Sequence, residues 1–462
     1  MKKQNRVAFF NILSTLLLKG ISIFTAPLFS RLLGTGGYGV TSIYSIWAGA
    51  SAIVLPMQTQ GTLVNARIEY DKNQQDKYHS AAMGLSVTIF AAFAAVILLF
   101  ARPIASALKL ETFLIYFMLL QAFGTFSVSF LSTKFTYEFK AGWNMLLSLG
   151  ITLTTLVLSV VLILQLPRDI NYYGRIAAVS LTYGIIGIPA CIWVLARGKT
   201  FFRRDYWKFC LYLALPSVFY NLSDLILGQS DRVMLQQMLS ASAVGQYSLA
   251  LNFGGIMFTI FGALNKCWTP FFFDDFKEGK LDRVHSQGKN FLELFTVLSV
   301  GFIMLAPEVY HIFASREFWD GTVLIPIFVS SYFLNFLCTF PVNFEYYHKK
   351  NKTVAVVTIL SSLLNIGLNY ILIRRMGMVG AALATAISHS LQLTMHYVYC
   401  RYVIGATDYP FGIRLWGKYA LCFFAVVALV YASGDMWYLR WIPGAALGFW
   451  ELYRISKRKV LI

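Results

Sequence analysis

The sequence predicts an all-α polytopic membrane protein with about fourteen transmembrane helices. The chain of 462 residues is 57% hydrophobic and only 13% charged, about half the charged fraction of a soluble domain. Apolar runs of about 20 residues, long enough to cross a hydrocarbon core of about 30 Å, recur along the whole chain. Basic residues concentrate in every second connection between these runs, which is typical of a multi-pass protein.

The apolar runs define the predicted spans. The first follows "MKKQNR" and is too long for the apolar region of a signal peptide, so we expect an uncleaved span. The predicted spans are 8–29, 39–61, 79–101, 111–132, 143–165, 173–196, 209–234, 244–265, 287–306, 322–345, 353–373, 378–400, 413–432 and 438–455.

The basic residues predict the orientation. With the N-terminus inside, 28 of the 39 lysines and arginines fall on the cytosolic side, as the positive-inside rule requires of short loops. Both termini are then expected in the cytosol. The net charge of +18 therefore reflects topology and attraction to anionic lipid head groups, and it does not indicate a nucleic-acid partner.

The sequence predicts neither a cofactor nor a metal. The six cysteines are scattered without a C-x-x-C pair, so we expect buried free thiols. No Walker A or H-E-x-x-H motif is present. We therefore expect a protein that is not an enzyme, driven by an ion gradient or by removal of its substrate rather than by ATP.

An internal repeat divides the predicted spans. At an offset of 206 residues, "RLLGTGGYGVTSIYS" (31–45) aligns with "QQMLSASAVGQYSLA" (237–251), and "DKYHS" (76–80) with "DRVHS" (282–286). We expect a six-helix half at 1–200, a parallel six-helix half at 201–404, related by an axis along the membrane normal, and two extra helices at 405–462. Such repeats are typical of transporters, whose substrate site lies between the halves.

The repeat also aligns two polar stripes. In the seventh span the stripe follows helical spacing and comprises Ser217, Asn221, Asp224, Gly228 and Asp231. Its counterparts in the first span are Asn11, Thr15, Leu18, Ser22 and Thr25, with Lys19 beside them. Polar faces inside a bilayer turn toward protein or a hydrated cavity, so we expect both stripes to line a cleft between the halves.

Several candidate residues keep alternative interpretations. Lys19, near the bilayer midplane, contacts substrate or a coupling ion, pairs with Asp224, or extends toward the lipid head groups. The same alternatives apply to Asp224 and its neighbour Asn221. Asp231 and Arg232 end the seventh span, as caps or as contacts to substrate, and being adjacent they need not face each other.

Three further residues of the predicted spans and their ends have alternative interpretations. Arg31 ends the first span and is interpreted as its anchor, with a role at the rim of the site as the alternative. His389 and His396 share one face of the twelfth span, where they either relay protons or pack as satisfied side chains.

Three segments resemble bacterial polysaccharide and O-antigen flippases. "SDRVMLQQMLSASAVGQYSLALN" (230–252) resembles their D-K/R-x-M-L…G-x-Y-S-x-A pattern, and residues 31–45 resemble the end of their first span. "YYHKKNKTVAVVTILSSLLNIGLNYILIRRMGMVGAALATAIS" (346–388) is similar to their most specific signature. Arg374 and Arg375 stand where this family often has a proline. These flippases belong to the multidrug/oligosaccharidyl-lipid/polysaccharide exporter superfamily.

The resemblance implies a flippase of the bacterial cytoplasmic membrane. Its substrate would be an undecaprenyl-diphosphate-linked oligosaccharide, moved from the inner to the outer leaflet by alternating access for O-antigen, capsule or exopolysaccharide assembly. A coupling ion, proton or sodium, and glycan polymerase or assembly proteins are the other partners implied. A lipid II flippase and an ion-coupled multidrug antiporter of the same superfamily remain alternatives. A membrane glycan polymerase or ligase is disfavoured, because the predicted outer loops are short.

Overall fold

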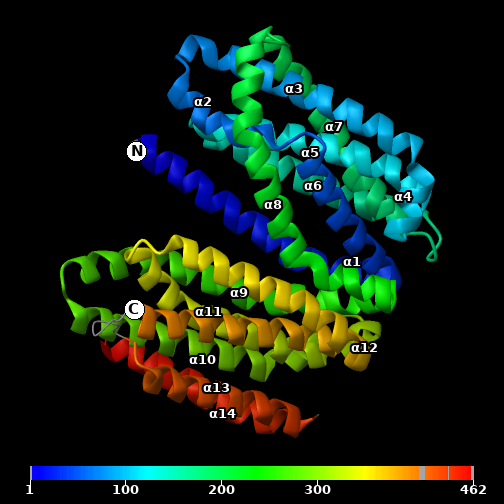
Figure 1. Cartoon of the computed structure of the whole chain (residues 1–462). Coiled ribbons are helices and arrows are strands. Elements are labelled where there is room, and N and C mark those ends of the chain that lie inside the picture. The colour runs from blue at the N-terminus through cyan, green and yellow to red at the C-terminus, as the bar shows by residue number, and fades with distance from the viewer. Residues whose placement is uncertain (1–2, 405–410, 435, 459–462) are drawn as a thin grey trace. The chain divides into compact units, whose positions relative to one another are not determined.

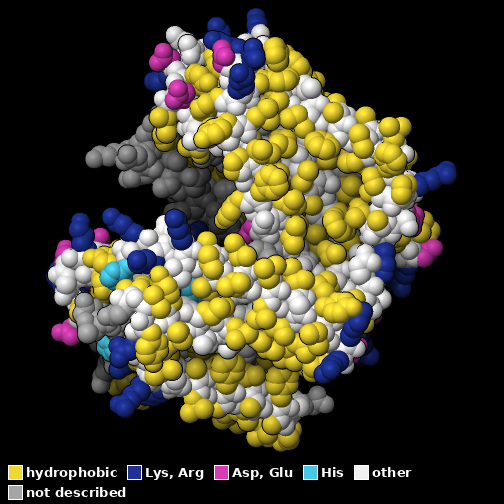
Figure 2. Space-filling model, viewed as in Figure 1, with side chains coloured by type: hydrophobic (Ala, Val, Ile, Leu, Met, Phe, Trp, Pro, Cys, Tyr) yellow, Lys and Arg dark blue, Asp and Glu magenta, His cyan; other side chains and the backbone are white. Residues whose placement is uncertain are grey.

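The computed structural model describes residues 3–404, 411–434 and 436–458, and in these ranges it confirms an all-α, multi-span fold. Ten described helices are long and apolar enough to cross a membrane, or eleven if one bent pair counts as a span. Hydrophobic side chains cover most of the face in Figure 2, while charged side chains gather at the helix ends. The chain forms two compact units, Met1–Gly245 (unit 1) and Gln246–Ile462 (unit 2).

Unit 1 begins with a long helix and a short 3₁₀ turn. Its elements are α1 (Lys3–Val54), η1 (Thr59–Thr62), α2 (Leu63–Glu69), α3 (Lys72–Leu99), α4 (Ala101–Leu108), α5 (Thr112–Tyr137), α6 (Ala141–Gln165), α7 (Tyr172–Gly198), α8 (Arg204–Met238) and the first turn of α9 (Ala241–Lys277). Within α1, Gly34 takes a positive φ of 64°, which only glycine adopts readily. Two of the predicted spans therefore join there as one kinked helix.

The helices of unit 1 pack through small residues and aromatic rings. A Cβ on Gly124 of α5 would overlap the backbone of Tyr183 in α7, so the absence of a side chain lets these helices touch, as is common in membranes. At the other side, Tyr78 of α3 and Tyr206 of α8 lie 5.5 Å apart, ring centre to ring centre. They belong to a buried cluster that also includes residues of α2, α5 and α7.

Unit 2 is built around α11. After the rest of α9 it contains α10 (Leu281–Phe313), η2 (Arg316–Leu324), α11 (Ile325–Tyr347), α12 (Asn351–Val398), η3 (Tyr399–Val403), α13 (Ile413–Ser433) and α14 (Trp437–Arg458). The most apolar part of α11 is 83% buried, against 17% for α6 of unit 1. α11 is therefore the central helix, and α13 and α14 pack against α10 (Figure 1).

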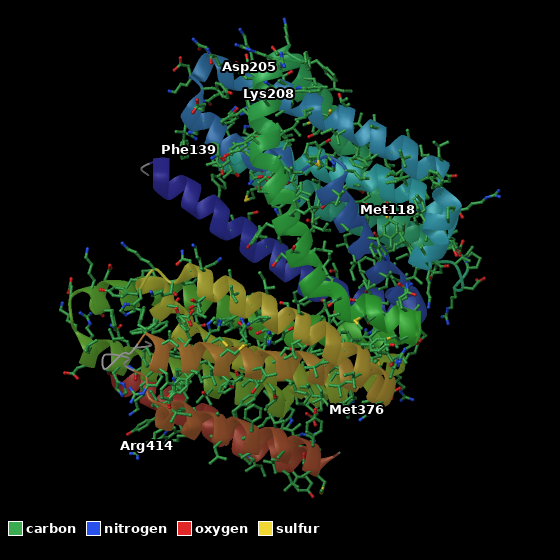
Figure 3. All side chains as sticks on the ribbon, viewed as in Figure 1. Met118, Phe139, Asp205, Lys208, Met376 and Arg414 are labelled. Atoms are coloured by element: carbon green, nitrogen blue, oxygen red, sulfur yellow. The ribbon has the colours of Figure 1, made fainter. Side chains whose placement is uncertain are left out.

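Successive helical segments of unit 2 run back and forth between its two ends, as the predicted spans do. α12 merges two predicted spans and bends at Gly377, whose φ is 59°. Met376 at this bend and Arg414 at the start of α13 lie at opposite ends of unit 2 (Figure 3). We call the end where α11 finishes and α13 begins the inner end of unit 2, and the end where α5 finishes and α8 begins the inner end of unit 1, after the predicted orientation.

The last two helices are attached by an ion pair. Arg440 of α14, 2% exposed, donates to the Glu308 carboxylate of α10 and to Ser433 Oγ (3.1 Å). Trp441 Nε1 donates to the second oxygen of Glu308 (3.2 Å). Charges in a membrane protein are tolerated when they are paired in this way, and the pair holds α14 to α10.

The cysteines depart in part from the prediction. Cys191, Cys210, Cys338 and Cys400 are buried free thiols as expected, whereas Cys267 of α9 and Cys422 of α13 are exposed. A thiol behaves as a small apolar group, so a surface on an apolar helix accommodates it without burial. Among the described residues no group of three or more potential metal ligands is found.

Candidate functional site along helix α8

Helix α8 is fixed at both of its ends within unit 1. Near its start, Trp207 Nε1 donates to the carbonyl oxygen of Ala81 in α3 (2.9 Å). Near its end, Lys109 Nζ donates to the carbonyl oxygens of Gln236 (3.4 Å) and Gln237 (3.0 Å). Carbonyls in the last turn of a helix lack helical partners, and a lysine there also complements the helix dipole. The middle of α8 is thereby held as a rigid support for its side chains.

The middle of α8 carries the predicted polar stripe. Asn221 Nδ2 donates to the carbonyl oxygen of Ser217 one turn earlier (2.7 Å), so its amide oxygen remains available. Asp224 is exposed, and no described side chain forms a hydrogen bond or ion pair with it. An acidic group in an apolar helix needs water, a ligand or an opposite charge as its counterpart. Asp224 and Asn221 therefore form the accessible part of this site.

Asp231 and Arg232 form a local pair at the outer part of α8. Arg232 Nε lies 3.7 Å from Asp231 Oδ1, and the two side chains are 15% and 13% exposed. The same oxygen accepts the backbone N–H of Arg232 (2.7 Å), and the guanidinium also donates to the carbonyl oxygen of Gly228 (3.2 Å). Adjacency did not require these side chains to face each other, but the structure brings them together. Their charges are balanced locally.

The predicted partner stripe is described only in part. Lys19 lies in α1, but its side chain is outside the described residues, as are those of Asn11, Thr15 and Ser22. The expected meeting of Lys19 with Asp224 thus stays a prediction. Arg31 is exposed three residues before the kink at Gly34, at the end of the predicted first span.

The two repeat-related turns of the sequence meet inside unit 1. A Cβ on Gly39 would overlap the backbone of Ala241, and one on its repeat mate Gly245 would overlap the backbone of Thr35. Thr35 and Ala241 are themselves mates at the 206-residue offset. Ser242 Oγ donates to Thr35 Oγ1 (2.7 Å). The contact of Gly39 with Ala241 is therefore equivalent, under the repeat, to the contact of Gly245 with Thr35. The sequence repeat did not predict that these segments touch.

One cation of unit 1 escaped the sequence analysis. Arg175 of α7 donates to Ser159 Oγ of α6 (2.9 Å), and its guanidinium carbon lies 3.7 Å from the centre of the Phe29 ring in α1. This cation–π stack joins three helices. Arg175 stands only one turn inside α7, and no pattern in the sequence distinguished it as a site residue.

A cluster of charged side chains around Lys134, here called the lysine cluster, lies at the inner end of unit 1. Lys134 of α5 is 1% exposed and donates to the Asp76 carboxylate, to His79 Nδ1 (3.0 Å) and to Glu138 Oε1 (3.0 Å). Lys134 was predicted in a cytosolic loop; instead α5 continues to Tyr137 and buries it. Three helices are involved, because Arg197 of α7 also pairs with Asp76 (2.9 Å).

Glu138 at the edge of this cluster is held in its charged form. Its second oxygen lies 2.6 Å from Lys140 Nζ. Burial alone would raise the pKa of the Glu138 carboxyl, but the hydrogen bonds from Lys140 and Lys134 outweigh burial and hold that pKa below its usual range. The lysine cluster is thus a network of permanent charges.

A different cluster lies at the inner end of unit 2. Glu345 of α11 and His396 of α12 are both 0% exposed, and His396 Nδ1 lies 2.8 Å from Glu345 Oε1. Cys400 of η3 points its Sγ at the same oxygen (3.6 Å) and at the carbonyl oxygen of Pro341 (3.4 Å). The two histidines of the predicted pair do not bond to each other, since His389 Nδ1 contacts the carbonyl oxygen of Ser331 (2.9 Å).

Comparison with known proteins gives this arrangement a context. The family described as "Polysaccharide biosynthesis protein" matches residues 6–274. An Lsg locus protein of Haemophilus influenzae is 22% identical over 347 residues, covering 73% of this chain and 83% of the relative.

Two solved structures show the same fold. The lipid II flippase MurJ in an inward closed conformation superposes with a TM-score of 0.69 at 14% identity, over 98% of this chain and all of that one. An inward-facing multidrug resistance MATE family transporter of the MOP superfamily gives a TM-score of 0.58 at 15% identity, over 85% and 94% of the two chains. Since the family match spans more than half of the sequence, this multi-pass chain belongs to the family described as "Polysaccharide biosynthesis protein".

Proposed function

We propose that the protein is a flippase that moves an undecaprenyl-diphosphate-linked oligosaccharide from the inner to the outer leaflet of the bacterial cytoplasmic membrane. The observation that carries this proposal is the match of residues 6–274 to the polysaccharide biosynthesis family. The fold, shared with transporters rather than with enzymes, supports movement of the substrate without chemical change. The glycan would serve surface polysaccharide assembly, such as O-antigen, capsule or exopolysaccharide.

The candidate residues match the chemistry of such a substrate. Asp224 and Asn221 offer unoccupied acceptor oxygens on a helix held at both ends, and sugar hydroxyls are donors to such oxygens. Lys19, beside the aligned stripe of α1, would supply a point charge for the diphosphate. The lipid needs no site inside the protein, because it stays in the bilayer.

The charge distribution supports the orientation. Most lysines and arginines fall in the connections that the predicted orientation assigns to the inner side, so the cytosol is the expected compartment for both termini. Alternating access would then expose the site first to the cytosolic leaflet and afterwards to the outer one. A proton or sodium gradient is the expected driving force, with assembly proteins removing the product outside.

Deletion of the gene in its own host tests the proposed function. We expect the full lipid-linked repeat unit to accumulate in the cytosolic leaflet while the surface glycan is lost. Asp224→Ala should fail to restore the glycan although the protein reaches the membrane, and the matched change Asp205→Ala, at the start of α8, should restore it. Normal surface glycan in the deletion strain would refute the flippase.

A lipid II flippase is the second candidate, because the MurJ fold covers this chain almost completely. Expressing the protein in cells depleted of their own lipid II flippase separates the two candidates. Restored growth would favour lipid II as the substrate, whereas failed rescue together with glycan accumulation in the deletion strain would favour the oligosaccharide. Resistance to cationic drugs on overexpression would instead indicate the multidrug antiporter.

A further inference from the structure

The Glu345–His396 pair at the inner end of unit 2 is sealed from solvent and incompletely bonded. Both side chains are 0% exposed and share one short contact of 2.8 Å. Glu345 Oε2 and His396 Nε2 are buried and have no hydrogen-bond partner among the described residues. Buried polar atoms are rarely left unpaired unless the site has a role besides packing. The unpaired atoms need an explanation.

Among the described residues, no third charged side chain forms an ion pair with Glu345 or His396. The other polar side chain that contacts Glu345 is the thiol of Cys400 on η3, and a thiol is neutral at neutral pH. The neighbouring helices supply aromatic rings next to the end of α11: Phe276 of α9, Phe291 of α10 and Trp416 of α13.

One acidic and one basic group of α9 and α10 form their own ion pair. Asp275 of α9 and Arg283 of α10 lie 3.4 Å apart. Among the described ion pairs, Glu345 and His396 have each other as the partner that balances a charge.

Such a pair is stable inside the protein only when it is neutral as a whole. With one proton between them, the two groups carry either opposite charges or none. With no proton the pair has a net charge of −1, and with two protons +1, and an unbalanced buried charge costs several kcal/mol. In water at neutral pH a carboxyl is ionised and an imidazole is mostly neutral, so the exposed pair has lost that proton.

The helix beside the pair is irregular at this point. η3 (Tyr399–Val403) is a turn of π-helix and carries Cys400, whose Sγ faces Glu345. π-Helical turns are strained insertions that occur frequently at functional sites. A change in the last turns of α12 and η3 would therefore uncover Glu345, His396 and Cys400 together.

We propose that Glu345 and His396 form a proton-binding site. The pair holds one proton while the end of α12 and η3 is closed on α11, and it gives that proton to water when this end opens. Proton release is thereby linked to opening of the inner end of unit 2. This inference concerns the protein without substrate, so it stands or fails independently of the proposed flippase activity.

Cys400 is a built-in reporter of the opening. The other five cysteines are replaced by alanine, and the full chain in detergent is labelled with N-ethylmaleimide at pH values between about 6.5 and 8. The labelling rate of an accessible thiol rises about tenfold per pH unit, because the thiolate is the reactive form. If one proton is released on opening, the open fraction of the protein also rises about tenfold per pH unit. We expect about a hundredfold increase per pH unit in the parent protein.

Matched variants isolate the carboxyl and the imidazole. Glu345→Gln retains a hydrogen bond to His396 without a titratable proton, and it should reduce the dependence to about tenfold per pH unit. His396→Gln leaves a buried carboxyl without an opposite charge, which holds a proton when closed and releases it on opening, so it should keep about a hundredfold dependence. Glu345→Leu also removes the carboxyl, and it serves if Glu345→Gln does not fold. His389→Gln, which alters a histidine of the same helix bonded only to a backbone carbonyl, should keep the hundredfold dependence.

The parent protein alone can overturn the proposal. A labelling rate that rises only tenfold per pH unit, equal to that of a small free thiol, means that no proton leaves when the site opens. A hundredfold dependence that persists in both Glu345→Gln and Glu345→Leu would place the proton elsewhere and would equally refute this site.

Discussion

The inner ends of the two units contain charged clusters of opposite design. In unit 1, Lys134 is surrounded by two carboxylates that keep further cationic partners and partial access to solvent. In unit 2, Glu345 and His396 are both 0% exposed, and each is the only ion-pair partner of the other among the described residues. A network with surplus partners tolerates the loss of one member, whereas a sealed pair does not. The network around Lys134 is suited to holding helices together permanently. The Glu345–His396 pair is suited to a site that changes its protonation state.

The largest expected loss follows from breaking the sealed pair. His396→Leu leaves the Glu345 carboxyl buried without its partner, which should lower the free energy of unfolding by about 3–5 kcal/mol. Glu345→Leu with His396→Leu removes both groups and should restore most of that stability, because apolar replacement of a buried pair is often neutral. Chemical unfolding in detergent measures both. If the double variant had a lower free energy of unfolding than the single variant, the pair would have a purely stabilising role.

A smaller loss is expected in unit 1. Lys134→Met removes the central cation, but Asp76 keeps Arg197 and Glu138 keeps Lys140. The expected cost is about 1–3 kcal/mol, that of unsatisfied hydrogen-bonding groups. The same unfolding measurement applies. If Lys134→Met lowered the free energy of unfolding by more than His396→Leu does, the lysine cluster would be the less tolerant of the two.

The two clusters should respond to pH with opposite signs. The pKa of Glu138 is lower in the folded protein, so its contribution is present above the ordinary carboxyl range, about 4.3, and is lost as pH falls through the folded value. The Glu345–His396 pair is proposed to hold a proton only in the closed protein, so its contribution is lost on the alkaline side. In Glu138→Gln the melting temperature should depend less on pH on the acid side only. In Glu345→Gln it should depend less on pH on the alkaline side only.

The smallest effect is expected at the rim of the lysine cluster. Lys140 is 41% exposed and lies 2.6 Å from Glu138. Exposed pairs contribute about 0–1 kcal/mol and are screened by salt. Lys140→Met should therefore change the melting temperature little, and less still at high salt. A loss comparable to that of Lys134→Met would show that the rim and the centre act as one unit.

The fold was more predictable than the charged clusters. Apolar runs and loop charges are local signals, and they located helices such as α5 and α7 to within a few residues. Lys134 instead followed a predicted span and resembled a loop residue, although it is buried. Its contact with His79 joins residues 55 positions apart, and that of Glu345 with His396 joins residues 51 apart. Spacing along one helix does not encode such pairings.

The accessible part of the site was predicted with more success than its surroundings. The polar stripe on α8 follows from helical periodicity, and Asn221 and Asp224 lie on that helix as expected. Arg175 was missed, because its partners Ser159 and Phe29 come from two other helices. The meeting of Gly39 with Ala241 was missed for the same reason, since the alignment of repeats indicates equivalence and not contact.

The packing of α8 has a consequence for the order in which the chain is made. The helix completes the aromatic cluster of α3 through Tyr206 and is capped by Lys109 at its other end. Lys109 is translated 128 residues before its acceptor Gln237, and Tyr78 likewise precedes Tyr206. The six preceding spans must therefore wait in the membrane with an unfilled groove until the seventh is inserted, and this nascent intermediate would be the stage most exposed to chaperones and quality-control proteases.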